Sequence, residues 1–184
     1  IIAILIAVAV CVVLGVVIEA IAYRPLRNAS PLAVLITAIG VSYLLQNLAL
    51  LIFGSTQYSF PRLFQMEAIH FGQFTFSGQS FITLLVTTII MIALHFFINQ
   101  TKIGKAMRAV SEDKGAAELM GISVNRTISV TFAIGSGLAA IAGLFYGLTY
   151  GFIGPYTGSM PGIKAFVAAV FGGIGSIPGA MLGG

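Results

Sequence analysis

The chain has 184 residues, of which 58% are hydrophobic and only 8% are charged, and its mean hydropathy is +1.05. Soluble globular domains carry about a quarter charged residues, so this composition excludes an ordinary soluble domain and indicates a membrane protein. The net charge of +4 does not indicate a nucleic-acid-binding protein, because the basic residues lie in short connections between apolar runs.

Apolar runs divide the chain into membrane segments. A helix needs about 20 predominantly apolar residues to cross the hydrocarbon core, and four runs approach or exceed this length. A fifth run is less regular. We therefore expect an all-α polytopic membrane protein, a helical bundle with about five membrane segments in a single domain over residues 1–184. The expected spans cover residues 1–22, 32–53, 81–98, 128–150 and 162–184.

The first span carries an acidic residue near one end, Glu19. An ionisable side chain at this depth is costly unless it is solvated or paired. We expect Arg24 to meet Glu19 at the membrane interface. A structural ion pair is favoured here over the alternative, a role in proton transport.

The second span contains several polar side chains. Gln46 and Asn47 are costly in lipid, so they should face the bundle interior or a path through it. Two interpretations stay open, because amides also bridge helices structurally. The candidates for a translocation path are Thr37, Ser42, Gln46 and Asn47.

Basic residues predict the orientation, because Lys and Arg gather in short cytoplasmic loops. The connection over residues 54–80 has Arg62 as its single basic residue, and residues 151–161 carry no charge, so both should face outward. The outer connection 54–80 is expected to hold a short hairpin or an interfacial helix. The cytoplasmic connections contain Arg24 and Arg27 after the first span, and Lys102, Lys105, Arg108, Lys114 and Arg126 after the third.

A short capped helix is expected in the long inner loop, residues 100–126. Ser111 suits its N-cap, Glu112 and Asp113 suit its first turn, and Gly121 suits the left-handed position at its C-terminal end. A helix of fewer than roughly 12 residues is marginal alone in water, so this helix needs a docking surface. That surface is either a soluble partner or the bundle itself. Its apolar part comprises Ala116, Ala117, Leu119 and Met120.

Small residues recur every four positions along the fourth span. Such a ridge lets helix backbones approach closely where lipid offers no hydrophobic drive for association. We therefore expect another helix of the bundle to pack on this ridge. Its members are Gly135, Ala139, Gly143, Gly147 and Gly151.

The last segment begins as a helix and then meets glycines at 172, 173, 175 and 179 together with Pro178. Non-helical backbone at membrane depth is tolerated only when it is buried in protein or lines a water-filled path. We therefore expect a broken or re-entrant segment beside the substrate route. A kinked structural span is the alternative.

Six motifs are spread through nearly the whole chain: EAIAYRPLR at 19–27, LITAIGVS at 35–42, LQN at 45–47, IGKAMRA at 103–109, AAELMGI at 116–122 and FGGIGSIPGA at 171–180. Together they resemble the permease subunits of branched-chain amino acid ABC importers, especially the H-type subunit of the leucine/isoleucine/valine system. Members of that family are longer, so the chain is expected to be an internal fragment.

The resemblance implies a translocation subunit rather than an enzyme, which moves leucine, isoleucine, valine or closely related small solutes inward. It implies a multi-pass protein of the bacterial inner membrane, surrounded by lipid. Its partners would be cytoplasmic ABC ATPase subunits, a second permease subunit and a periplasmic solute-binding protein, with no nucleic acid. The chain has no G-x-x-x-x-G-K-[ST] pattern, so ATP and Mg would be bound by the partner ATPase and no cofactor by this chain. The alternative is a secondary transporter or channel.

In that family the inner loop is a variant of the EAA-type coupling segment, which seats in a groove of the ATPase. The matching positions are Glu112, Ala116, Ala117 and Gly121. The order departs from a strict Glu-Ala-Ala triplet, because Lys114 and Gly115 precede the alanines. This departure leaves open which acidic residue pairs with the ATPase.

Overall fold

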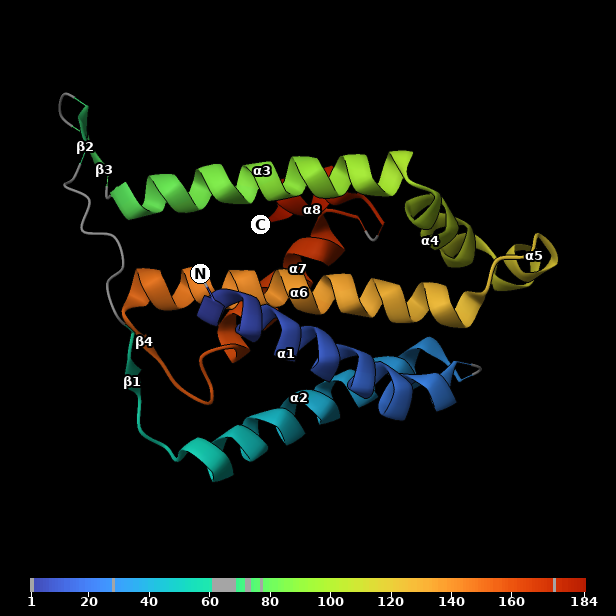
Figure 1. Ribbon diagram of the computed structural model, residues 1–184, viewed down its shortest axis with the longest axis horizontal. Helices are drawn as coiled ribbons and strands as arrows, with labels where there is room; N and C mark the ends of the chain where they lie inside the picture. Colours follow the sequence, from blue (N-terminus) through green and yellow to red (C-terminus); the bar gives the residue numbers. More distant parts are fainter. Residues whose placement is uncertain (1, 28, 61–68, 72–73, 77, 174) are drawn as a thin grey trace. The chain divides into compact units, whose positions relative to one another are not determined.

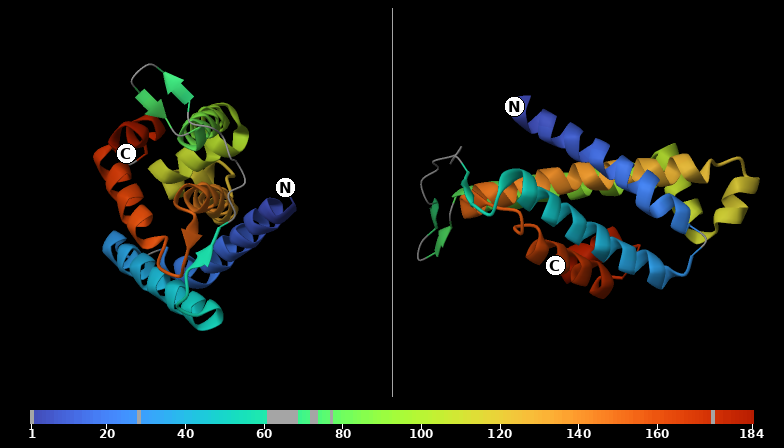
Figure 2. Two further views of the ribbon diagram at one scale, coloured as in Figure 1. Left: turned by 90° about the vertical axis from the view of Figure 1, so that its left-hand side faces the viewer. Right: turned by 90° about the horizontal axis from the view of Figure 1, so that it is seen from below.

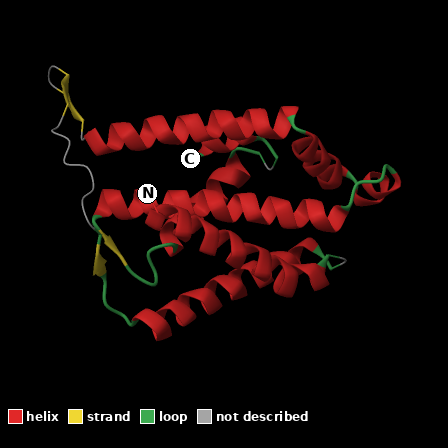
Figure 3. Ribbon diagram, in the orientation of Figure 1, coloured by secondary structure: helices red, strands yellow, loops and turns green. Residues whose placement is uncertain are grey.

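The computed structural model describes residues 2–27, 29–60, 69–71, 74–76, 78–173 and 175–184. Helices make up most of the described chain, and short strands occur only in the connections between them (Figures 1 and 3). The chain forms two compact units. Unit 1 comprises residues 1–48 and 96–146, and unit 2 comprises residues 49–95 and 147–184. Arg62, the basic residue of the connection over residues 54–80, lies outside the described residues.

In the part of the chain that the structure describes, four helices are long and apolar enough to cross a membrane, which confirms the expected all-α membrane class. Most of their side chains are exposed or half-buried, as expected for helices whose solvent is lipid. The first helix is followed by a wider π turn over Glu19–Tyr23 and then by a tighter 3-10 turn over Arg24–Leu26. The four helices are α1 (Ile2–Ile18, followed by these turns), α2 (Pro31–Phe53), α3 (Gly78–Gln100) and α6 (Val124–Tyr150).

Within unit 1, α1 crosses α6 at an incline (Figure 2). Gly15 of α1 lies so close to the Ser136 side chain that a Cβ at Gly15 would overlap it. A Cβ at Gly137 would lie 3.4 Å from Cγ2 of Val12. At one end of α1, the rings of Tyr23 and Phe132 approach to 5.0 Å between centroids.

Within the described chain, no helix packs on the predicted α6 ridge at Gly135 or Gly143. A Cβ at Gly135 or Gly143 would meet no atom of the described chain within 4 Å. Successive residues of a helix are separated by about 100° around its axis, so Ser136 and Gly137 present a different face from Gly135. Gly147 does pack closely, but against the side chains of Phe60 and Ile153 rather than against a helix.

Two helices of unit 1, α4 (Lys102–Glu112) and α5 (Lys114–Leu119), follow α3. Thr101 caps α4, because its hydroxyl accepts a hydrogen bond from the Gly104 amide at 3.0 Å. Gly104 is buried, and a Cβ there would collide with the backbone of Ile98. The sharp corner between α3 and α4 therefore depends on glycine at this position.

Unit 2 contains two strand pairs. The first joins β1 (Tyr58–Ser59) antiparallel to β4 (Phe152–Ile153), with Tyr58 opposite Ile153. The second pairs β2 (Ile69–Phe71) antiparallel with β3 (Phe74–Phe76), which agrees with the first of the two alternatives for this connection, a short hairpin or an interfacial helix.

The last segment is broken, as expected. Helix α7 (Ser159–Phe171) and helix α8 (Ile177–Gly183) are separated by five residues, within which Gly173 and Gly175 have φ values of +89° and +100°. The backbones of Gly172 and Gly179 touch, and a Cβ at either would overlap the other. The glycines therefore permit both the break and the close return of α8 toward α7.

Candidate functional site

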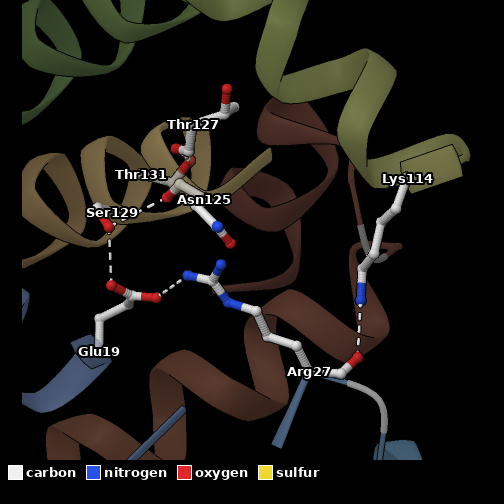
Figure 4. A network of polar contacts seen from close by, with 7 residues as sticks. All are labelled: Glu19, Arg27, Lys114, Asn125, Thr127, Ser129 and Thr131. Atoms are coloured by element: carbon white, nitrogen blue, oxygen red, sulfur yellow. Dashed lines mark hydrogen bonds and ion pairs between the residues drawn. The ribbon is translucent and has the colours of Figure 1, made fainter. Parts of the chain in front are cut away.

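A buried polar cluster lies in unit 1, at the end of α1 that is nearest α5. It consists of Glu19, Arg27 and Ser129, and we refer to it as the Glu19 cluster (Figure 4). Glu19 is only 1% exposed, although it belongs to an otherwise apolar helix. Its carboxylate accepts hydrogen bonds from the Arg27 guanidinium, with which it forms an ion pair, and from the Ser129 hydroxyl at 2.8 Å.

The partner of Glu19 differs from the one predicted from the sequence. Arg24 contributes its backbone N–H, which donates to the Glu19 carbonyl and closes the π turn. The 3-10 turn that follows contains Pro25 and carries the chain round, so that the Arg27 side chain returns to Glu19. The sequence does not indicate this pair, because the helix changes its period twice between the two residues.

Arg27 has more donors than the cluster uses. Its side chain is 15% exposed, and its Nε and Nη1 atoms are buried without a hydrogen-bond partner among the described residues. The side chain of Asn125 points toward the guanidinium in Figure 4. The Arg27 carbonyl accepts a hydrogen bond from Nζ of Lys114 on α5 at 3.3 Å. Arg27 thus contacts both the end of α1 and the short helix of the inner loop.

The short helix α5 has six residues, and its N-cap is Asp113 rather than Ser111. The Asp113 carboxylate accepts hydrogen bonds from the amides of Gly115 at 2.8 Å and Ala116 at 3.1 Å. Ser111 lies inside α4, where its hydroxyl donates to the Arg108 carbonyl at 2.7 Å. The backbone of Asp113 is extended, with φ −149° and ψ 112°, so it ends one helix and begins the next.

Gly121 ends α5 as predicted. Its φ of +80° is a left-handed conformation that favours glycine. Its amide donates to the carbonyl of Glu118 at 2.9 Å, and the amide of Ile122 donates to the carbonyl of Ala117 at 3.0 Å. These two bonds form a Schellman motif, which satisfies carbonyls that a short helix would otherwise leave free.

The four predicted coupling residues differ in exposure. Ala117 is 3% exposed and packs with Val110 and Val124 in a small core between α4, α5 and α6. In contrast, Leu119 is 91% exposed and Met120 is 83% exposed. The other predicted residues, Glu112, Ala116 and Gly121, are exposed. The apolar surface that α5 offers outward is therefore the pair Leu119 and Met120, which we call the α5 tip.

The four path candidates on α2 make local contacts. The Thr37 hydroxyl donates to the carbonyl of Ala33, and the Asn47 amide donates to the carbonyl of Tyr43. Ser42 and Gln46 are brought together, with Nε2 of Gln46 3.3 Å from the serine oxygen. They are one helical turn apart and share a face, whereas Thr37 lies on a different side of the helix. Ser42 and Asn47 are exposed, and Thr37 and Gln46 are half-buried.

Metal chemistry has no candidate ligand set in the part of the chain that the structure describes. No group of three or more His, Cys, Asp and Glu side chains gathers there.

Comparison with known proteins gives one family. The model of the family described as "Branched-chain amino acid transport system / permease component" matches residues 1–184. The chain is 47% identical over 171 residues to the high-affinity branched-chain amino acid transport system permease protein LivH of Salmonella typhimurium, covering 91% of this chain and 56% of LivH. It is 45% identical over 172 residues to BraD of Pseudomonas aeruginosa, a protein with the same description, covering 91% of this chain and 56% of BraD.

A more distant relative is the probable branched-chain amino acid transport permease protein LivH of Methanocaldococcus jannaschii. It is 31% identical over 172 residues, covering 89% of this chain and 53% of the relative. The chain thus spans about half the length of the curated relatives it matches. No solved structure matches the chain significantly.

Proposed function

Because the chain belongs to the family of permease components of branched-chain amino acid transport systems, we propose that it forms part of the membrane subunit of an ATP-driven importer. The solutes are leucine, isoleucine and valine or closely related small molecules. The protein is a translocation subunit of the bacterial inner membrane, and a separate ATPase binds and hydrolyses ATP. The observation that carries this proposal is the α5 tip, an exposed apolar pair on a helix that is capped at both ends and anchored by a buried alanine.

The support of the tip is built from three local features. Asp113 caps one end of α5, the Schellman motif at Gly121 ends it, and Ala117 anchors its inward face. A six-residue helix does not persist alone in water. Since these contacts already hold α5 on its own bundle, the outward face is free to serve a second surface.

The chemistry of the tip favours a soluble protein partner. Fully burying a leucine or methionine side chain stabilises a complex by about 1.5–3 kcal/mol, so the pair is sufficient to anchor a contact. The acidic residues Glu112 and Glu118 precede the pair in the sequence, and both are exposed. An apolar pair with acidic residues before it fits a groove on a soluble ATPase better than it fits lipid, which would leave the carboxylates desolvated.

The proposed solutes follow from the similarity to LivH and BraD, both named for high-affinity branched-chain amino acid transport. Ser42 and Gln46 are the proposed polar contacts along the path, since they are joined to each other and share one face of α2. A path with few fixed charges suits aliphatic side chains. A periplasmic binding protein and a second permease subunit complete the proposed importer.

The test is transport by the complete importer in proteoliposomes. The full-length permease, its second permease subunit, the ATPase and the binding protein are reconstituted and offered radiolabelled leucine, isoleucine, valine and urea. We expect uptake of the three aliphatic amino acids only when ATP and the binding protein are both present. Uptake that is driven by a proton or sodium gradient without the ATPase would instead identify a secondary transporter.

A further inference from the structure

Arg27 joins two parts of unit 1 that are far apart in sequence. Its carbonyl accepts the hydrogen bond from Lys114 of α5, and its guanidinium pairs with Glu19 at the end of α1. Ser129 of α6 completes the connection by donating to the other carboxylate oxygen of Glu19 (Figure 4). One arginine therefore bridges the short helix and the first span.

Helix α5 and the start of α6 pack against each other. Ala117 and Val124 are buried together with Val110, and the Schellman motif fixes the short connection between the two helices. A displacement of α5 must therefore move this end of α6 directly. The first span has no such covalent connection to α5, so it follows only through side-chain contacts.

The contacts of α1 differ along its length. Beyond the Glu19 cluster, α1 meets α6 through small and apolar groups, at Gly15 with Ser136 and at Val12 with Gly137. Packing of this kind in a membrane has no hydrophobic drive and depends on van der Waals contact. The bonds of Glu19 are charge-assisted and directional, so they determine where the end of α1 lies.

Stability alone does not account for the Glu19 cluster. Buried ion pairs often stabilise a fold no better than apolar residues of the same volume, and ionisable residues in membrane segments usually have a function. The pair also lies at a π turn, a feature frequent at functional sites. The unpartnered Nε and Nη1 atoms of Arg27 leave donors for a second arrangement, with the Asn125 side chain beside them.

We propose that Arg27 is a positioning residue that makes α1 follow α5, so that movement of the α5 tip reaches the first span as well as α6. This inference rests on the proposed function, in which the tip contacts an ATPase. The Lys114 bond to the Arg27 carbonyl passes the movement from α5, and the Arg27 pair with Glu19 passes it to α1. Without this connection, ATP hydrolysis would move α6 while α1 lagged behind.

The variant that decides the question must leave folding intact. Lys114→Met meets this requirement because Lys114 is exposed. The matched control is Lys105→Met, which removes the same charge from an exposed position on α4. Uptake of leucine per ATP hydrolysed is measured in the complete importer. We expect Lys114→Met to lower this ratio roughly two- to tenfold, the equivalent of one hydrogen bond, with ATPase co-purification unchanged. The Lys105→Met importer should keep the wild-type ratio.

A second variant tests the buried pair. The double change Glu19→Gln with Arg27→Gln removes both charges together and so avoids leaving one buried charge unpaired. We expect uptake per ATP to fall at least about fivefold, the lower end of typical coupling between sites, while stimulated hydrolysis continues. If the pair were merely structural, the yield of folded permease would fall, and the folded permease would keep the wild-type uptake per ATP.

The outcomes separate the two claims. A wild-type ratio in the Lys114→Met importer would overturn the inference, whatever the double variant does. Absence of ATP-dependent uptake by the unmodified importer would overturn the proposed function instead.

Discussion

Ala117 and Leu119 are two residues apart on α5 and face opposite environments. Ala117 is enclosed by Val110 and Val124, whereas Leu119 is almost fully exposed. A sequence pattern marks both as the apolar part of a short helix, but only one is available to a partner. The difference decides which substitution tests partner binding and which tests folding.

Replacing Leu119 with Ser should weaken binding of the ATPase without unfolding the permease. Loss of one buried leucine corresponds to about 1.5–3 kcal/mol, or roughly a tenfold to hundredfold rise in Kd. The measurement is ATPase affinity for the purified permease, with thermal stability recorded alongside. Ile103→Ser, which removes an exposed apolar side chain from α4, is the control and should bind as the wild type does. Equal affinity of the Leu119 variant would exclude the tip from the interface.

A change from Ala117 to Leu should act on folding instead. Overpacking a filled core costs typically about 1–3 kcal/mol, so this variant should lose stability before any effect on binding is considered. The melting temperature of the purified permease reports this loss. An unchanged melting temperature would mean that the small core adjusts without strain.

At the scale of elements, α5 depends on its caps. Asp113→Ala removes the acceptor of two backbone amides and should cost about 0.5–2 kcal/mol of local stability. Hydrogen exchange at residues 114–121 should become faster by roughly two- to thirtyfold. Ser111→Ala serves as the control and should change exchange there much less. Faster exchange in the Ser111→Ala variant than in the Asp113→Ala variant would instead identify Ser111 as the cap.

The corner between α3 and α4 gives a second element-scale prediction. Gly104→Ala places a Cβ against the Ile98 backbone, which cannot move aside as a side chain can. We expect a loss of about 1–3 kcal/mol, detected as a lower melting temperature in detergent. Gly143→Ala is the matched control, because no described atom lies within 4 Å of its added Cβ. It should be neutral, or more stable by up to about 1 kcal/mol through helix propensity.

At the scale of the whole molecule, each unit brings together connections of one kind. In unit 1 the basic connections meet, since Lys114 bonds to the carbonyl of Arg27. In unit 2, the connection after α2 pairs with the connection after α6 through β1 and β4. A chain whose spans alternate across the bilayer requires this grouping, because the first and third connections lie on one side.

The predicted orientation can be tested by labelling in intact cells. In a background with Cys11→Ala, a cysteine at Glu112 should react with an impermeant reagent only after the membrane is opened. A cysteine at Ser55 should react from outside without opening. Both positions are exposed, so the accessibility of each side chain is not limiting. Labelling of Glu112→Cys from the periplasmic side would show that the orientation is inverted.

The sequence by itself determined the membrane class, the presence of long apolar helices, the break in the last segment and the glycine that ends α5. These features depend on local composition, on helix length against bilayer thickness and on the conformational freedom of glycine. Only the tertiary structure decided that Glu19 pairs with Arg27, that Asp113 caps α5, that Ala117 is buried and that α6 meets α1 through Ser136 and Gly137 rather than Gly135. Glu19 and Ser129 are 110 residues apart, and a contact over that separation depends on how whole helices pack, which no local pattern specifies.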